Sequence, residues 1–302
     1  MNRLRLGTRS SALARAQSEW AAQRLREAHP GLEIEAVFIK TSGDRFSLSG
    51  KPSAECAPPD VKAMFVKEIE EALLRGEVDF GVHSSKDLPA ETPEGLCIAA
   101  YPVREDPRDV FVPGSSPSWS EVPARATIGT ASLRRQVQLR LRRPDILFEA
   151  LRGNVDTRLR KLKEKGFAGL ILAEAGLKRL GLESVRREIL PEDIVIPAPG
   201  QGALAIEARQ DREDVRRVLS VLDDRRSRLE VETERALLKA VGGGCSTPLG
   251  ALARLEGETM ALSVFWARED GGGATRLSGR CGLAPAELAA LVQDLRGRLP
   301  AA

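Results

Sequence analysis

The sequence has few of the residues that build metal, nucleic-acid and membrane sites. Its 302 residues include four widely spaced cysteines and only two histidines, so the spacing of zinc and iron–sulfur sites is absent and we expect no metal. Aromatic residues make up 4% of the chain, which argues against stacking platforms for single-stranded nucleic acid. No apolar run reaches the roughly 18 residues that cross a bilayer, and residues 1–7 lack the apolar core of a signal peptide. We therefore expect a cytoplasmic protein with reduced thiols and no membrane partner.

What the sequence does contain is typical of a globular protein of two or three domains. Hydrophobic residues account for 42% and charged residues for 29% of the chain. The formal net charge is only +3, so no cationic field covers the whole molecule. Many arginines nevertheless stand together at particular places, and this clustering is more informative than the sum.

The first hundred residues have the alternation of an α/β domain. Periodicity and turn residues predict strands at 4–8, 33–41, 78–83 and 96–100, and helices at 12–28 and 61–75. Residues 42–59 are rich in Ser, Gly and Pro without a period, which fits either a mobile lid or a disordered insertion. Residues 101–123 are expected to be mostly loop and to contain a domain boundary.

The next segment opens as the first one did. A strand at 126–130 ends in Gly-Thr and leads into a helix that begins near Ser132, and a helix at 155–165 is followed by Gly166 and a strand at 167–173. Two α/β lobes built alike are the simplest interpretation, although chance similarity between strand–helix turns is an alternative.

A small α+β third domain is expected at the end of the chain. It follows a predicted strand at 194–196, a Pro/Gly hinge at 197–202 and a strand at 203–208 that returns to the first lobe. The predicted elements of this domain are helices at 228–240 and 285–299 and strands at 249–255, 259–268 and 274–281.

A glycine-rich loop at 242–248 holds Cys245. Three successive glycines permit backbone conformations that other residues resist, and they allow a close approach to a ligand. The loop fits either a presented thiol or a flexible turn with a small buried thiol.

Arginines stand at three predicted strand-to-helix junctions. Arg9 precedes the first helix, Arg134 and Arg135 occupy the first turn of another, and Arg152 precedes a helix that has Arg158 one turn in. The N-terminus of a helix carries the positive end of its dipole. An arginine there is favourable when an anion lies between the guanidinium group and the helix N-terminus. The arrangement therefore predicts a ligand with several acidic groups, and the alternative is a set of solvated arginines paired with nearby Asp or Glu.

An acidic residue follows the predicted strand at 78–83. Asp87, next to Lys86, can face a ligand cleft from the carboxyl end of that strand and stabilise a cationic intermediate. A structural Lys–Asp pair in a turn is the alternative, and His83 fits a packed core histidine.

Several motifs in the same order resemble the porphobilinogen deaminase family, also called hydroxymethylbilane synthase. They cover nearly the whole chain and lie at residues 82–87, 129–136, 151–158, 175–181, 199–203 and 243–245. The segment at 59–65 departs from the family pattern Gly-Gly-Lys-Gly-Leu-Phe, because only Lys62 and Phe65 match it.

The resemblance implies an α/β fold with two periplasmic-binding-protein-like (type II) lobes around a cleft and a small α+β third domain. The implied domains are residues 1–102 with 203–222, residues 103–202 with hinges near 103–108 and 197–202, and residues 223–302.

The resemblance also implies a reaction and the residues that perform it. A dipyrromethane cofactor would be held by Cys245 through a thioether, and four porphobilinogen units would be joined head to tail with loss of ammonia before water releases the linear tetrapyrrole. Asp87 would serve the pyrrole nitrogens and the azafulvene cation. Residues matching the cofactor-binding set are Lys86, Ser132, Arg134, Arg135 and Arg158. Those matching the set that binds substrate and growing chain are Arg9, Ser11, Arg152 and Arg179.

Two other classes of function compete with this interpretation. A solute-binding module would share the two-lobed cleft, but it would need neither a presented Cys245 nor Asp87. A nucleic-acid-binding protein would explain the arginines, but the low net charge and sparse aromatics oppose it. We therefore expect a monomeric enzyme that takes a small-molecule substrate and binds no nucleic acid.

Overall fold

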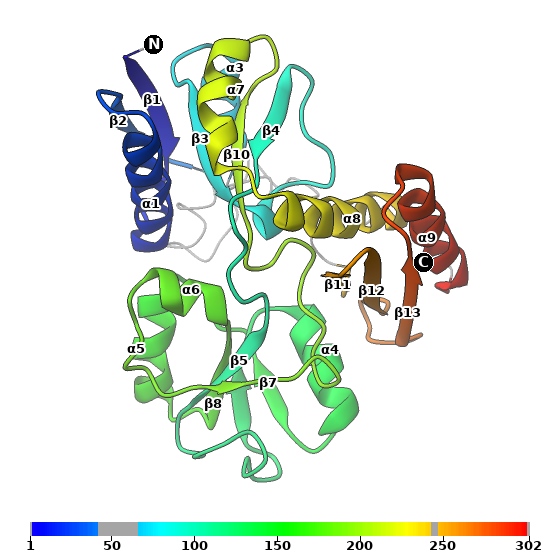
Figure 1. The fold of residues 1–302 in the computed structure, drawn as a ribbon. Coiled ribbons are helices and arrows are strands. Elements are labelled where there is room, and N and C mark those ends of the chain that lie inside the picture. Colours follow the sequence, from blue (N-terminus) through cyan, green and yellow to red (C-terminus); the bar gives the residue numbers. More distant parts are fainter. Residues whose placement is uncertain (1, 42–65, 243–246, 301–302) are drawn as a thin grey trace, which may run out of the picture. The chain divides into compact units, whose positions relative to one another are not determined.

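The computed structural model describes residues 2–41, 66–242 and 247–300 (Figure 1). The chain forms two compact units, one of Met1–Glu105 with Ala203–Leu229 and the other of Asp106–Gly202 with Glu230–Ala302. The expected lid at 42–59, the divergent segment at 59–65 and Cys245 lie outside the described residues.

The first unit is built on a five-stranded sheet with the order β2-β1-β3-β10-β4. Strand β1 pairs in parallel with β2 and β3, whereas β10 runs antiparallel to β3 and β4. The strands are β1 (Arg3–Thr8), β2 (Glu33–Phe38), β3 (Phe80–Ser84), β4 (Leu96–Ala100) and β10 (Leu204–Arg209). The predicted return of the chain to the first lobe after residue 202 is confirmed.

Helices cover both faces of this sheet. On one face, α1 (Ala12–Ala28) and α7 (Glu213–Leu219) pack their apolar residues on those of the strands, such as Leu6, Phe80 and Ile206. On the other, α3 (Lys67–Leu74) places Ile69 and Leu73 in a separate apolar cluster. Among its described residues, this unit also has the 3-10 helices η2 (Ser85–Asp87) and η3 (Ser220–Leu222).

The second unit repeats this arrangement in a sheet with the order β7-β6-β8-β5-β9. Here β6 pairs in parallel with β7 and β8, and β5 runs antiparallel to β8 and β9. In both sheets the fourth strand in the order runs antiparallel to its neighbours. In the sequence, β10 follows the other four strands of the first sheet, and β5 precedes the other four strands of the second. The expectation of two α/β lobes built alike is confirmed. The elements are β5 (Asp109–Pro113), β6 (Thr127–Gly129), β7 (Leu147–Glu149), β8 (Gly169–Ala173), β9 (Glu188–Ile189), α4 (Leu133–Arg142), α5 (Val155–Lys165) and α6 (Glu174–Arg179).

One sequence-based prediction in this unit is wrong, and one strand was not predicted. Residues 101–123 are mostly loop, as expected, but they also contain β5, whose Val110, Phe111 and Val112 are buried. A strand covered on both faces has no polar alternation, and three apolar residues are too short a run to identify it. Residues 194–196 form no strand, because Ile196 bonds to side chains of α4 rather than to a neighbouring strand.

The same unit also contains the predicted small α+β part. Strands β11 (Gly250–Glu256), β12 (Thr259–Trp266) and β13 (Thr275–Cys281) form an antiparallel sheet, accompanied by α9 (Pro285–Arg298). Helix α8 (Arg225–Val241) begins in the first unit and continues into the second from Glu230. Buried Leu291 and Leu295 of α9 lie against Gly279 of β13, where a side chain would collide with Leu291.

We predict that Gly169→Ala destabilises the second unit. A Cβ at Gly169 would overlap the Phe111 ring and lie 2.9 Å from the Val112 carbonyl oxygen, so β5 and β8 would have to separate. The expected loss of unfolding free energy is about 1–3 kcal/mol, measured by urea denaturation. Gly176→Ala in α6 is the matched control, because the added Cβ would have no described atom within 4 Å apart from its chain neighbours and the backbone of its own helix. Equal stability of the two variants would contradict the packing argument.

Candidate functional site

In the first unit a small pocket contains three of the predicted site residues. Arg9 follows β1, Ser11 caps α1, and Asp87 ends the 3-10 helix after β3, and all three line a pocket of about 60 Å³. The parallel strands β1 and β3 end at the same edge of the sheet, which is where open α/β sheets place ligands. The volume suits one small polar group rather than a whole ligand.

The walls of this pocket are held by hydrogen bonds. Ser11 accepts one from the backbone N–H of Ala14 over 3.3 Å, as a helix N-cap does. Gln17 of α1 donates to the hydroxyl of Ser84 over 2.9 Å, which joins the helix to the end of β3. Asp87 and its neighbour Lys86 are both half-buried.

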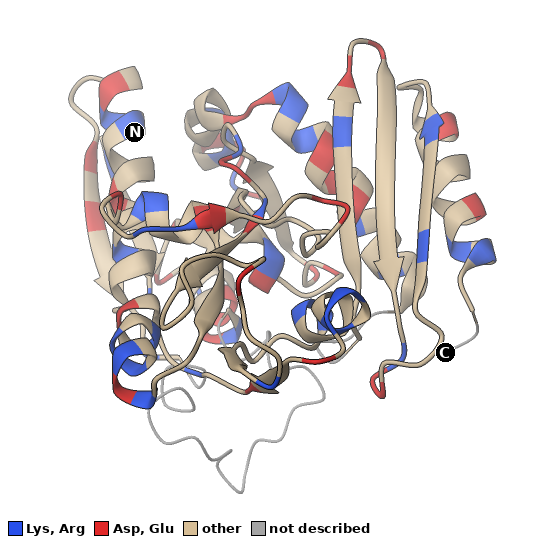
Figure 2. Cartoon of the chain, turned by 90° about the horizontal axis from the view of Figure 1, so that it is seen from below, with Lys and Arg blue, Asp and Glu red and all other residues tan. Residues whose placement is uncertain are grey.

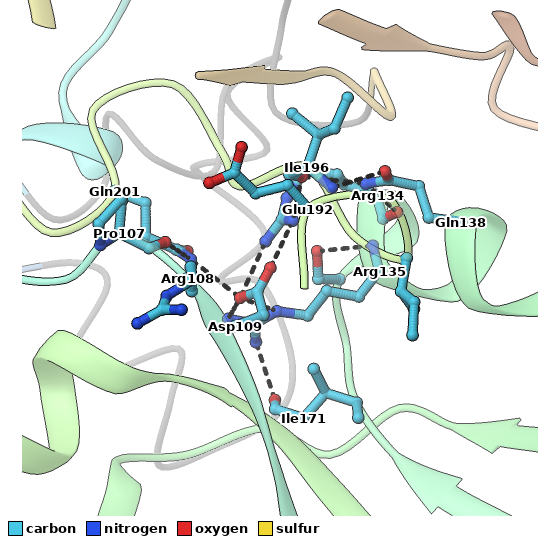
Figure 3. A network of polar contacts seen from close by, with 12 residues as sticks. Pro107, Arg108, Asp109, Arg134, Arg135, Gln138, Ile171, Glu192, Ile196 and Gln201 are labelled. Atoms are coloured by element: carbon cyan, nitrogen blue, oxygen red, sulfur yellow. Dashed lines mark hydrogen bonds and ion pairs between the residues drawn. The ribbon is translucent and has the colours of Figure 1, made fainter. Parts of the chain in front are cut away.

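In the second unit the arginines at the start of α4 surround one buried carboxylate (Figure 3). Arg134 donates to Asp109 over 2.7 and 3.3 Å, and Arg135 donates to it over 2.9 and 2.6 Å. Gln201 donates to the same carboxylate over 2.9 Å. Asp109 is fully buried, and the two arginines are 6% and 5% exposed.

The two arginines are also fixed by backbone carbonyls. Arg134 donates to the carbonyl of Ile196 over 2.7 Å, and Arg135 donates to that of Ile171 over 2.9 Å. Among the described residues no acceptor meets the Nε–H of Arg134. This guanidinium therefore keeps a donor for a group from outside the network.

Electrostatics holds this network ionised. Burial alone would raise the pKa of Asp109, but Arg134, Arg135 and Gln201 outweigh it and keep the pKa well below its usual range. Burial lowers the pKa of Arg135 and Asp109 opposes this, and an arginine stays protonated in any case. Two cations and one anion leave a net charge of +1.

Sequence reasoning missed Asp109. The arginines at this junction do have an internal partner, as the paired alternative supposed, although a single carboxylate cannot neutralise both. The signal was an Asp immediately before Val110, Phe111 and Val112, because an acid next to a buried strand requires cations nearby.

The other predicted residues of the second unit lie at helix ends. Ser132 caps α4 and accepts from the backbone N–H of Arg135 over 3.4 Å. Arg158 of α5 donates to the Gly153 carbonyl over 2.8 Å, and Arg152 just before that helix is exposed. Arg179 at the end of α6 donates to the carbonyl of Gly202 over 2.6 Å.

Comparison with protein families decides where the chain belongs. Residues 4–217 match the family model described as porphobilinogen deaminase, dipyromethane cofactor binding domain. Residues 228–299 match the one described as porphobilinogen deaminase, C-terminal domain. The chain belongs to the porphobilinogen deaminase family. The resemblance of its motifs to this family is thereby confirmed.

Curated relatives extend the porphobilinogen deaminase match over most of the chain. The porphobilinogen deaminase of Syntrophus aciditrophicus is 47% identical over 259 residues, which cover 86% of this chain and 83% of the relative. That of Geobacter sulfurreducens is 46% identical over 271 residues, which cover 90% and 83%.

Solved structures that this member of the family resembles are more distant. The methionine-binding protein MetQ has a TM-score of 0.47 and 14% identity, and the match covers 73% of this chain and 89% of MetQ. The aliphatic sulphonate binding protein SsuA of Escherichia coli has a TM-score of 0.41 and 15% identity, and the match covers 80% and 70%. The assignment of two α/β lobes rests on the strand orders given above.

The residues around Asp109 fit the cofactor of porphobilinogen deaminases. The family model names a dipyromethane cofactor. The resemblance of the motifs to the family implies that the pyrroles of this cofactor carry acetate and propionate groups. A buried group of net charge +1, with a donor left over on Arg134, suits such carboxylates. The helix N-terminus at Ser132 adds a positive dipole end.

We predict that Asp109→Asn destabilises the second unit by about 3–5 kcal/mol, because it leaves two buried cations without their counter-charge. Urea denaturation measures the loss. Asp145→Asn is the matched control, since Asp145 forms a similar 2.7 Å pair with Arg143 at the surface and its removal should change stability little. A loss no larger at Asp109 than at Asp145 would show that the buried network does not stabilise the unit.

Proposed function

We propose that this chain polymerises four porphobilinogen molecules head to tail, with loss of ammonia, and releases the linear tetrapyrrole hydroxymethylbilane by hydrolysis. The family match over residues 4–217 and 228–299 carries the proposal. The buried net-positive group at the start of α4 supports it, because every intermediate of such a polymer carries several carboxylates.

Asp87 is the catalytic residue of this proposal. When ammonia leaves a porphobilinogen unit, positive charge develops on the carbon it leaves and spreads to the ring nitrogen. The carboxylate of Asp87 accepts a hydrogen bond from that pyrrole N–H, stabilises the charge, and takes up and returns protons. Its position at the edge of the sheet, in one pocket with Arg9 and Ser11, supports this role.

The cationic residues bind carboxylates in two sets. The first set holds the acetate and propionate groups of the cofactor and comprises Lys86, Ser132, Arg134, Arg135 and Arg158. The second holds the incoming substrate and growing chain and comprises Arg9, Ser11, Arg152 and Arg179. Planar guanidinium groups suit this task because each can donate two parallel hydrogen bonds to one carboxylate.

Cys245 is the covalent anchor. Its thiolate sulfur forms a thioether to the dipyrromethane, which stays attached through successive rounds of synthesis. When bound, this group supplies the pyrrole carbon to which the first unit is joined, and each later unit is joined to the one before it. The glycines at 242–244 support the assignment, because they let the backbone come close to a bulky group.

The three-domain division at residues 1–102 with 203–222, 103–202 and 223–302 is part of the proposal. So are a monomeric state, a cytoplasmic location and the lack of a nucleic-acid partner. Acidic and basic residues are interspersed over most of the described chain (Figure 2), which supports the last of these. The free thiols of Cys97 and Cys281 support a reducing compartment. In the described part of the chain no helix has both the length and the apolar content to cross a membrane.

We predict that Cys245→Ser folds but carries no covalent pyrrole, because a serine hydroxyl is a far weaker nucleophile than a thiolate. Pyrrole absorbance retained by denatured and desalted protein measures attachment. Cys281→Ser is the matched control and should keep the pyrrole, since Cys281 lies within β13. An active Cys245→Ser variant, or one that retains pyrrole, would refute the anchor.

We predict that Asp87→Asn retains the covalent pyrrole yet loses most of its turnover, by about 10²-fold or more, because the amide cannot hold a proton or a negative charge. Tetrapyrrole formed per pyrrole-loaded chain is the measurement. A rate near that of the wild type would mean that Asp87 is not the catalytic carboxylate.

A further inference from the structure

Three ionisable side chains are buried together behind the Asp87 pocket. They are Glu70 of α3, His83 of β3 and Glu207 of β10, and they are 7%, 4% and 0% exposed. His83 Nε2 lies 3.1 Å from a carboxylate oxygen of Glu207, without the alignment of a hydrogen bond. We call these residues the acid–histidine cluster.

The sheet places His83 and Glu207 on one face. Glu207 stands directly opposite Gly81 in the antiparallel β10–β3 pair, and His83 is two residues from Gly81 on the same side. A Cβ at Gly81 would lie 2.9 Å from His83 Nε2 and 2.9 Å from Ile69. The lack of a side chain at Gly81 therefore leaves room for the imidazole of His83. Helix α3 covers the cluster with Ile69 and Glu70.

The cluster has more negative charge than it can balance. Two carboxylates face one imidazole, so full ionisation leaves a net charge of −1 even when His83 is protonated. Among the described residues, His83 Nε2, both Glu207 carboxylate oxygens and Glu70 Oε1 have no hydrogen-bond partner. Buried charge without hydrogen bonds is costly, and an additional proton on a carboxylate removes this cost.

Glu70 is the group best placed to hold this proton. Burial, with a further contribution from Glu207, raises the pKa of Glu70 to about 7, and His83 partly opposes the shift. Near neutral pH the cluster therefore changes its net charge when Glu70 gains or loses a proton.

The cluster is in contact with the wall of the candidate site. His83 and Ile69 line the same 60 Å³ pocket as Arg9 and Asp87. His83 is also only four residues before Asp87 along the chain, at the end of β3. A negative charge in the cluster lies close to the place where a substrate carboxylate would meet Arg9.

We propose that the acid–histidine cluster is a buried proton-binding site that sets the charge behind the Asp87 pocket and so controls the binding of carboxylated substrate there. Glu70, His83 and Glu207 are positioning residues in this account, since they act through the pocket wall and need not touch substrate. The inference rests on the proposed function for its substrate, but its proton binding does not depend on it.

Other charged and titratable groups surround the cluster. On α3, Glu71 repels the charged form of Glu70, and Glu68 lies on the same helix. On β4, burial raises the pKa of the Cys97 thiol and Glu207 adds to this, while Arg216 and Arg228 lower it. The pocket itself contributes Arg9 and Asp87. Glu70 is buried, its Oε1 has no hydrogen-bond partner in the described part of the chain, and its pKa is raised to about 7.

The test compares Glu70→Gln with the wild type and with Glu71→Gln, a neighbouring acid whose side chain is 46% exposed. KM and kcat for porphobilinogen are measured from about one pH unit below to one above 7. KM should rise with pH in the wild type and in Glu71→Gln, by a factor about three- to tenfold larger than in Glu70→Gln. This is the effect expected when the negative charge of Glu70 forms close to a substrate carboxylate. The ratio of kcat values between variants should stay constant with pH. Identical KM profiles for the wild type and Glu70→Gln would overturn the coupling.

A second measurement reads the proton without substrate. Between about pH 4.5 and about 7 the folded chain keeps a proton on Glu70 that the unfolded chain has lost, so wild-type stability should fall as pH rises through this window. Glu70→Gln should lack this component of the fall in urea denaturation, and Glu71→Gln should retain it. Parallel stability curves for the wild type and Glu70→Gln would overturn the proton-binding site. Because this arm uses no substrate, it separates failure of the cluster from failure of the proposed function.

Glu207→Gln provides an independent variant should Glu70→Gln fail to fold. Removing the Glu207 charge lowers the pKa of Glu70, so the rise in KM should shift to lower pH. A merely structural role would change stability without moving this midpoint, and an unmoved midpoint would overturn the proposal.

Discussion

The buried carboxylate of Asp109 is the constraint on which the second unit depends. It accepts hydrogen bonds from Arg134 and Arg135 of α4 at the first residue of β5. Gln201 donates a further hydrogen bond to it. Burying three charges costs several kcal/mol per ion, and this arrangement recovers the cost only because every member is hydrogen-bonded. In the proposed function, the same bonds hold Arg134 in place for the carboxylates of the cofactor. Protein stability and cofactor binding then depend on one set of contacts.

The network extends to the three-stranded sheet of the same unit. Gln138 of α4 donates to the Ile196 carbonyl over 3.0 Å and accepts from Arg276 of β13 over 2.9 Å. Arg276 also donates to the carbonyl of Ile194 over 2.7 Å. Residues 194–196 are thus held between α4 and β13 without joining a sheet. This explains why an apolar run with the composition of a strand forms none.

Sequence patterns predicted the amphipathic helices and the longer apolar strands. The helix at 155–165 has the expected bounds, and β10 returns to the first sheet because Leu204 and Ile206 supply apolar residues where its core needs them. Strand β5 could not be predicted in this way, since its short apolar run is buried on both faces. Among the site residues, the arginine junctions were visible because cations at helix starts are unusual. Asp109 was not, because its partners are 25 and 26 residues away and meet it only through the fold.

In the proposed function, the two units contribute different chemical groups. The first places a half-buried carboxylate, Asp87, beside Arg9 at a sheet edge, and the second keeps a surplus of positive charge at the start of α4. A polymer of carboxylated pyrroles requires both, together with a tether that does not turn over. The intact mass of the purified, active chain tests this account most directly. It is predicted to exceed the mass of the bare sequence by that of one dipyrromethane. A mass equal to the bare sequence in active protein would contradict it.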